Sequence, residues 1–160
     1  MTTTPSIPPI SGTSTVGVSI ADAFRVFSDS FDAWWPHQYH IGQVDVAEVV
    51  LEPRAGGRWY ERGIDGSECD WGRVLAWEPP HRLVFTWQIN GQWQFDPDPE
   101  RASEIEVRFT SEGPGQTRVE VEHRHVDRLV GGQAIHDAIN GGGGWTVLLD
   151  GFAKALANDG

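Results

Sequence analysis

The chain has helix-like hydrophobic periodicity near both ends and strand-like alternation between them. Ser19 is a favourable helix N-cap, and Ala23, Phe24 and Phe27 fall on one face of a helix predicted over residues 20–28. An apolar face of this kind indicates a helix that packs against a core.

A second short helix is expected directly after the first, capped by Asp29 or Ser30 and ended by Pro36. A candidate strand at 11–18 precedes both helices, and the Pro- and Thr-rich residues 1–10 read as a flexible lead-in. The apolar residues of the second helix are Phe31, Trp34 and Trp35.

From residue 44 onward the period changes to two, which is typical of strands. Near the end of this region Val119, Val121 and His123 share one face, while the charged residues between them share the other. A sheet with one buried face and one solvent-exposed face is typical of antiparallel strands. The strands are predicted at 45–52, 56–62, 68–77, 82–89, 103–111 and 116–125.

After the strands, residues 127–139 read as one short helix or a mobile segment. The four glycines from Gly141 to Gly144 then interrupt the helical pattern. A long C-terminal helix then carries an apolar stripe made by Trp145, Leu148, Leu149, Phe152 and Leu156. The order predicts an α+β fold in residues 11–158: a curved antiparallel sheet of six to seven strands wrapped around this helix.

Composition narrows the possible partners. The net charge of −11 disfavours nucleic acid and anionic membrane surfaces, and no apolar run is long enough to insert into a bilayer. The single cysteine, Cys69, fits a reducing compartment, and with no signal-like segment we expect a cytoplasmic protein. Eight tryptophans in 160 residues either fill a solid core or line a semi-open aromatic cavity.

Several local motifs resemble those of the SRPBCC superfamily, and within it the activators of the heat-shock protein 90 ATPase. The resemblance covers about residues 13–157. The motifs are Asp22-Ala23-Phe24, Trp34-Trp35-Pro36, Glu52-Pro53-Arg54-Ala55-Gly56-Gly57-Arg58-Trp59, Gly72-Arg73-Val74-Leu75-Ala76-Trp77-Glu78-Pro79-Pro80, Arg82-Leu83-Val84-Phe85-Thr86-Trp87, Val121-Glu122-His123 and Gly144-Trp145.

This resemblance implies a helix-grip fold (START-like, pollen-allergen-like) with a hydrophobic internal cavity. It does not imply one function, because the superfamily includes lipid carriers, polyketide cyclases, aromatases and chaperone activators. Strand parity and the helical stripe select the side chains expected to line that cavity. The candidate ligand-binding residues are Trp34, Trp35, His37, His40, Trp59, Glu61, Trp71, Phe85, Trp87, His123, Trp145 and Leu149.

Two of these residues are titratable groups that parity directs inward, Glu61 and His123. Burial moves the pKa of a carboxylate up and that of a histidine down, which suits acid–base chemistry. They are therefore the candidate catalytic pair. The alternative is that each is a structural group satisfied by one hydrogen bond, with Arg62 or Arg73 pairing with Glu61 at the rim. Within 68–77 both parities are apolar, so either Trp71 or Asp70 faces inward.

Other polar residues give weaker indications of ligand binding or catalysis. His37 and His40 lie at the expected cavity mouth, where they contact a ligand's polar end or form a plain surface loop. No second ligand pair has metal-site spacing, so we predict no metal and no cofactor. The acids beside Cys69 raise its thiol pKa and argue against a nucleophile.

Three hypotheses for function follow. The first is an intracellular protein that binds a small apolar molecule, aromatic or lipid-like. The second is a cyclase, aromatase or hydratase in which Glu61 works with His123 or His40. The third is a co-chaperone-like interaction module. A homodimer through an edge strand or the hairpin tip at 93–95 is a further possibility.

Overall fold

A computed structural model describes residues 7–35, 41–42, 44–141 and 144–159. Strands and helices follow each other in nearly the predicted order. They are β1 (Ile10–Val16), α1 (Ile20–Asp29), α2 (Phe31–Trp34), β2 (Val46–Leu51), β3 (Arg58–Gly63), β4 (Glu68–Glu78), β5 (Arg82–Trp87), β6 (Ser103–Gly113), β7 (Gln116–Arg124), α3 (Gly132–Gly141) and α4 (Gly144–Asp159), with short 3-10 turns η1 (Pro99–Arg101) and η2 (Val126–Arg128).

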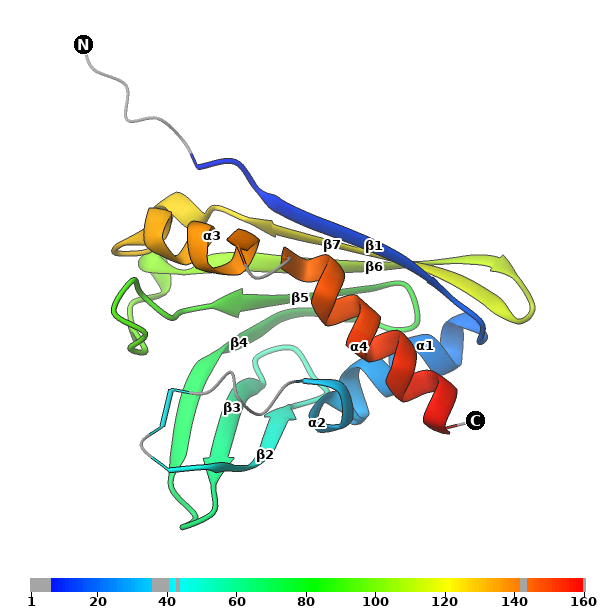
Figure 1. Ribbon diagram of the computed structural model, residues 1–160, viewed down its shortest axis with the longest axis horizontal. Helices are drawn as coiled ribbons and strands as arrows, with labels where there is room; N and C mark the ends of the chain where they lie inside the picture. The colour runs from blue at the N-terminus through cyan, green and yellow to red at the C-terminus, as the bar shows by residue number, and fades with distance from the viewer. Residues whose placement is uncertain (1–6, 36–40, 43, 142–143, 160) are drawn as a thin grey trace.

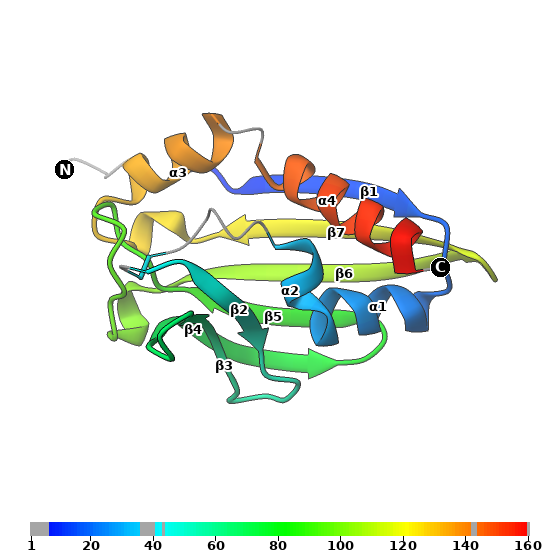
Figure 2. The same cartoon turned by 60° about the horizontal axis from the view of Figure 1, so that its bottom comes forward.

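All seven strands form one antiparallel sheet in the order β1-β7-β6-β5-β4-β3-β2. The sheet bends strongly between its β1 and β2 edges, and α1, α2 and α4 lie on its inner face (Figure 1, Figure 2). The predicted α+β helix-grip architecture is confirmed. Since one face of the sheet is covered by helices, the alternating apolar residues of the strands are buried there.

Helix α1 agrees with the sequence prediction, whereas the segment after the last strand differs from it. Ser19 caps α1, because its side chain accepts a hydrogen bond from the Asp22 backbone N–H at 3.2 Å. The segment predicted as one helix over 127–139 instead contains η2 and then α3, which begins at Gly132. His125 precedes η2 with φ of 60°, a left-handed conformation that turns the chain before a helix can start.

Strand β4 contains two irregularities that set which side chains face inward. Its register with β3 shifts so that Trp71 is an extra residue between two paired positions, and its register with β5 shifts again at Leu75. Each β-bulge reverses the inward parity. Trp71 and Val74 are therefore both buried, while Asp70 lies on the outer face.

The C-terminal helix closes the inner face against the first strand. The predicted apolar stripe of α4, from Trp145 to Leu156, is buried. At Gly12 in β1, an added Cβ would meet backbone and Cβ atoms of Trp145 and Thr146 at 3.0 Å, so the helix and the strand approach closely because this residue is glycine. Side chains of the sheet and of the helix therefore pack together into one hydrophobic core on the inner face.

Candidate functional site

Aromatic side chains from six elements meet on the inner face of the sheet. Trp59 lies at their centre, with ring-centroid distances of 5.0 Å to Phe85, 5.3 Å to Trp71 and 5.5 Å to Trp35. The rings meet mostly edge to face, an arrangement that adds stability beyond area burial. We call this set the aromatic cluster: Phe31, Trp35, Trp59, Trp71, Phe85, Trp87, His123 and Trp145.

Most of the predicted ligand-binding residues thus lie together. Trp34 is buried on the helix side of the cluster, packed against Phe27 of α1 and Phe152 of α4. Leu149 of α4 is also fully buried. His37 and His40 lie outside the described residues.

His123 on β7 is fully buried, as its parity predicts, and both its ring nitrogens have partners. The indole N–H of Trp145 donates to Nδ1 at 3.4 Å, so Nε2 carries the proton and donates to Ser103 Oγ at 2.8 Å. The Ser103 hydroxyl in turn donates to the Trp87 carbonyl at 3.0 Å. Ser103 and His123 are therefore a hydrogen-bonded structural chain, since the hydroxyl proton points away from the imidazole.

Burial also fixes the charge of this histidine. Removal from water lowers the pKa of His123 from 6.5 to about 3, and the nearby His136 contributes in the same direction. The ring is neutral at physiological pH. Ser103 is not among the residues predicted from the sequence, although it shares the inward parity of Ile105 and Val107 on β6.

Glu61 on β3 is the buried carboxylate beside the aromatic cluster, with 2% of its surface exposed. Its Oε1 accepts hydrogen bonds from the Trp71 indole N–H at 2.8 Å and the Ile41 backbone N–H at 2.7 Å, and its Oε2 accepts from the Gly42 backbone N–H at 3.2 Å. The side chain links the segment before β2 to the sheet. The alternative in which Arg62 or Arg73 pairs with Glu61 at the rim is not borne out, because these arginines pair with Glu48 and Asp70.

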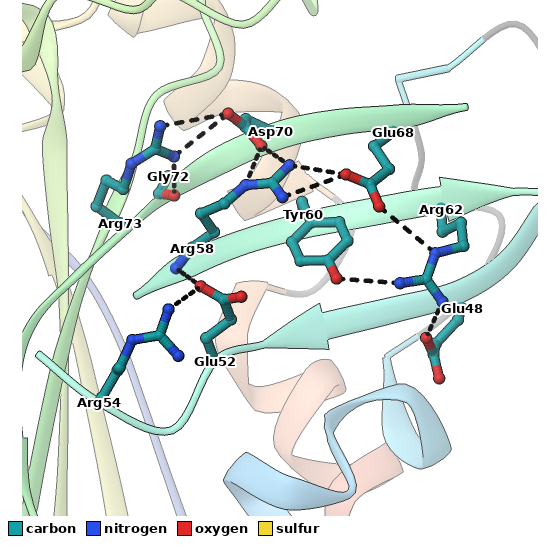
Figure 3. Close-up of polar contacts among 10 residues, drawn as sticks. All are labelled: Glu48, Glu52, Arg54, Arg58, Tyr60, Arg62, Glu68, Asp70, Gly72 and Arg73. Atoms are coloured by element: carbon teal, nitrogen blue, oxygen red, sulfur yellow. Dashed lines mark hydrogen bonds and ion pairs between the residues drawn. The ribbon is translucent and has the colours of Figure 1, made fainter. Parts of the chain in front are cut away.

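Those arginines lie on the opposite, outer face of β2, β3 and β4 (Figure 3). Arg73 pairs with Asp70 at 3.3 Å, and Arg62 pairs with Glu48 at 2.9 Å. Strand alternation is the reason, because Arg58, Tyr60 and Arg62 face outward and Glu61, between them, faces inward as its parity predicts. We call these charged residues of β2–β4 the outer-face network: Glu48, Arg58, Arg62, Glu68, Asp70 and Arg73.

A surface hollow of about 530 Å³ opens beside the N-terminal residues of β4. Its wall combines apolar side chains with part of the outer-face network. Cys69 reaches it, and burial raises the pKa of the Cys69 thiol, with the charges of Glu61, Asp70 and Asp65 adding to the effect. The thiol is thus protonated and a poor nucleophile. The lining residues are Ile41, Arg58, Glu68, Cys69, Asp70, Trp93, Gln94 and Phe95.

Among the residues that the structure describes, no three histidine, cysteine or carboxylate side chains lie close enough together to hold a metal ion. No helix in this part of the chain has both the length and the apolar character that a membrane span needs.

The bent sheet, the two short helices and the long closing helix define a helix-grip domain of the START-like superfamily. The chain belongs to the family of Activator of Hsp90 ATPase homolog 1-like proteins, whose family model matches residues 18–157. A search of curated protein sequences gave no match.

Solved structures of similar chains include an anthrahydroquino-γ-pyrone synthase, Txn09, complexed with SUM. It is 43% identical, with 94% of this chain and 97% of that chain covered, at a TM-score of 0.66. The self-sacrificing resistance protein CalC from Micromonospora echinospora is 31% identical, with 96% of both chains covered, at a TM-score of 0.69. An HSP90 activator from Plasmodium falciparum is 18% identical, with 74% and 73% covered, at a TM-score of 0.51, and shares the fold.

Proposed function

We propose that this protein binds a flat polycyclic aromatic molecule of the anthraquinone class against its aromatic cluster and promotes an intramolecular ring closure on it. The observation that carries this proposal is the cluster itself. Five tryptophans from α2, β3, β4, β5 and α4 converge there, and all five are buried. Indole rings offer large, flat contact areas, and cavities that bind apolar ligands are lined mainly by such groups.

The comparisons support the ligand class. The similar chain of 43% identity is an anthrahydroquino-γ-pyrone synthase, and the similarity extends over 94% of this chain. A γ-pyrone fused to an aromatic ring forms when a phenolic oxygen adds to a side-chain carbonyl carbon and the resulting hydroxyl leaves as water. Such a closure needs the two reacting ends held together and bulk water excluded, which is what an aromatic enclosure supplies.

Glu61 is the better acid–base candidate of the two groups named from the sequence. Its carboxylate contacts the cluster through the Trp71 indole at 2.8 Å, and each of its oxygens has two lone pairs, whereas each nitrogen of His123 offers a single hydrogen-bonding site. His123 is neutral, and both its nitrogens are engaged with Trp145 and Ser103. We therefore assign Glu61 the proton transfers of the closure and His123 the support of the cluster wall.

Two assays test the proposal. Intrinsic tryptophan fluorescence titrated with a hydroxyanthraquinone is expected to show saturable quenching. Incubation with an ortho-hydroxyaryl diketone of the same ring system is expected to yield a product that is lighter by one water, as measured by mass spectrometry. This product is expected to form faster with the protein than without it. Absence of saturable binding contradicts the proposal, and binding without conversion contradicts the ring-closure step.

Simple sequestration is the second candidate, favoured by the 31% identity to a self-sacrificing resistance protein. It predicts binding with no cyclised product in the same two assays. The co-chaperone hypothesis is supported by the family model over residues 18–157 and by the fold shared with an HSP90 activator of 18% identity. Recovery of a chaperone in stoichiometric amount by this protein is the result that would favour it.

A further inference from the structure

One indole in the aromatic cluster has an unsatisfied polar atom. Trp59 is fully buried, and its Nε1–H has no hydrogen-bond partner among the described residues. The rings of Trp35, Trp71 and Phe85 lie within 5.5 Å of its own, measured between centroids. A buried donor without a partner is costly, and such donors are rare in folded proteins.

Other buried indoles of the same core are satisfied by the chain itself. The acceptors are backbone carbonyls for Trp34 and Trp87, at 3.1 and 3.0 Å, and side chains for Trp71 and Trp145, at 2.8 and 3.4 Å. The fold thus supplies acceptors to indoles in neighbouring positions. Trp59, at the centre of the cluster, is the exception.

A water molecule is a poor partner for this N–H. A buried water is stable when it makes two to four hydrogen bonds. The described side chains in ring contact with Trp59 are Phe31, Trp35, Trp71, Phe85 and Trp87. The indole N–H groups of Trp71 and Trp87 already donate to Glu61 and to the Ile89 carbonyl. A ligand that carries one oxygen acceptor on an apolar ring fits these surroundings better.

We propose that Trp59 Nε1–H donates a hydrogen bond to a carbonyl or phenolic oxygen on the edge of the bound aromatic ligand. The inference rests on the proposed function and narrows it. It requires a ligand that combines a flat ring system with an oxygen acceptor, as a quinone or anthrone does, and it disfavours plain hydrocarbons and aliphatic lipids. A site with a buried donor discriminates against ligands that leave the donor unpaired.

The test compares two ligands of the same shape, anthraquinone and anthracene, on the full chain. Wild type is expected to bind anthraquinone roughly three- to tenfold more tightly than anthracene, as one net hydrogen bond provides. Trp59→Phe removes the donor, and it is expected to weaken anthraquinone binding by that factor. The affinity for anthracene is expected to be nearly the same in the variant as in wild type. Fluorescence quenching of the remaining tryptophans measures both affinities.

Trp77→Phe is the control, because Trp77 is a tryptophan outside the aromatic cluster, packed against Phe24 of α1. It is expected to keep the wild-type preference for anthraquinone. If wild type and Trp59→Phe show the same ratio of affinities, the role of Trp59 is overturned while the proposed function stands. If wild type binds neither ligand, the proposed function itself fails.

A second measurement does not depend on the variant folding. In isotope-labelled wild type, proton–nitrogen correlation spectra resolve the indole N–H signals. Anthraquinone is expected to move the Trp59 indole proton downfield, and anthracene is not. Equal shifts of that signal with both ligands would overturn the hydrogen bond.

Discussion

The chemistry of His123 is decided by the atoms that its ring contacts. Alternation along β7 correctly predicts that the ring faces inward, and burial alone suggests an acid–base group. The contacts with Trp145 and Ser103 give it a different role, because they occupy both nitrogens of a neutral imidazole. These partners come from α4 and β6, far away in the sequence, so no local pattern reveals them.

The low pKa of His123 gives a pH dependence of stability. The unfolded chain binds this proton below pH 6.5, whereas the folded protein does so only near pH 3. The contribution to folding is therefore complete above pH 6.5 and is lost as the pH falls towards 3, at about 1.4 kcal/mol per pH unit.

Urea unfolding of wild type and His123→Gln between these pH values measures the effect. The variant is expected to be less stable at neutral pH and to show a shallower loss of stability on acidification. The difference between their free energies of unfolding above pH 7 serves as the baseline. Parallel curves for the two proteins would contradict a buried neutral histidine.

Glu61 has a structural role that its inward parity does not reveal. Glu61→Gln is expected to lower the free energy of unfolding by about 1–3 kcal/mol, because the new amide group faces a backbone N–H where the carboxylate accepted from Ile41, Gly42 and Trp71. Equilibrium urea denaturation measures the change. Glu48→Gln, in a half-exposed ion pair, is the control and is expected to cost under about 1 kcal/mol. Equal losses would show that the Glu61 contacts do not matter for stability.

At the scale of elements, alternation predicts β6 and β7 well and β4 poorly. In β6 and β7 the pairing is regular over most of their length, so every second residue is buried. In β4 two bulges change the parity, so Trp71, Val74 and Trp77 all contact the inner side despite their uneven spacing. A bulge depends on the partner strands, which a single strand's sequence does not specify.

The close approach of β4 to β5 depends on Gly72. A Cβ at this position would lie 2.0 Å from the Thr86 carbonyl oxygen of β5, so Gly72→Ala is expected to cost at least about 1–3 kcal/mol. Gly115, in the turn between β6 and β7, has no atom within 4 Å of an added Cβ, and Gly115→Ala is expected to stay within about 0.5 kcal/mol of wild type. Thermal unfolding compares the two variants. A tolerated Gly72→Ala would mean that β4 and β5 separate easily at this position.

At the scale of the whole molecule, element order and a few motifs were enough to predict the helix-grip fold. They did not define the ligand, because the superfamily places different chemistries on the same fold. Which ligand a member of the superfamily binds depends on individual groups, such as the indole N–H of Trp59 and the hydrogen-bond partners of Glu61. These become visible once the strands are paired.

Ligand binding also has a global consequence for stability. A molecule that binds only the folded protein is expected to stabilise it by about 2.7 kcal/mol at a concentration of 100 Kd. Thermal shift with hydroxyanthraquinone, compared with an aliphatic fatty acid of similar size, measures the effect. A rise with the fatty acid alone would contradict the aromatic ligand class.

The position of β1 in the sheet has a consequence for biosynthesis. Ile10 and Val16 pair with His123 and Thr117, so the first strand of the chain must wait for the last before it can join the sheet. Helix α4, which packs on β1, is made later still. On the ribosome the aromatic side chains stay accessible until β7 and α4 have been synthesised. Until then the nascent domain is prone to aggregation, and a ligand present at that stage can be enclosed as α4 docks.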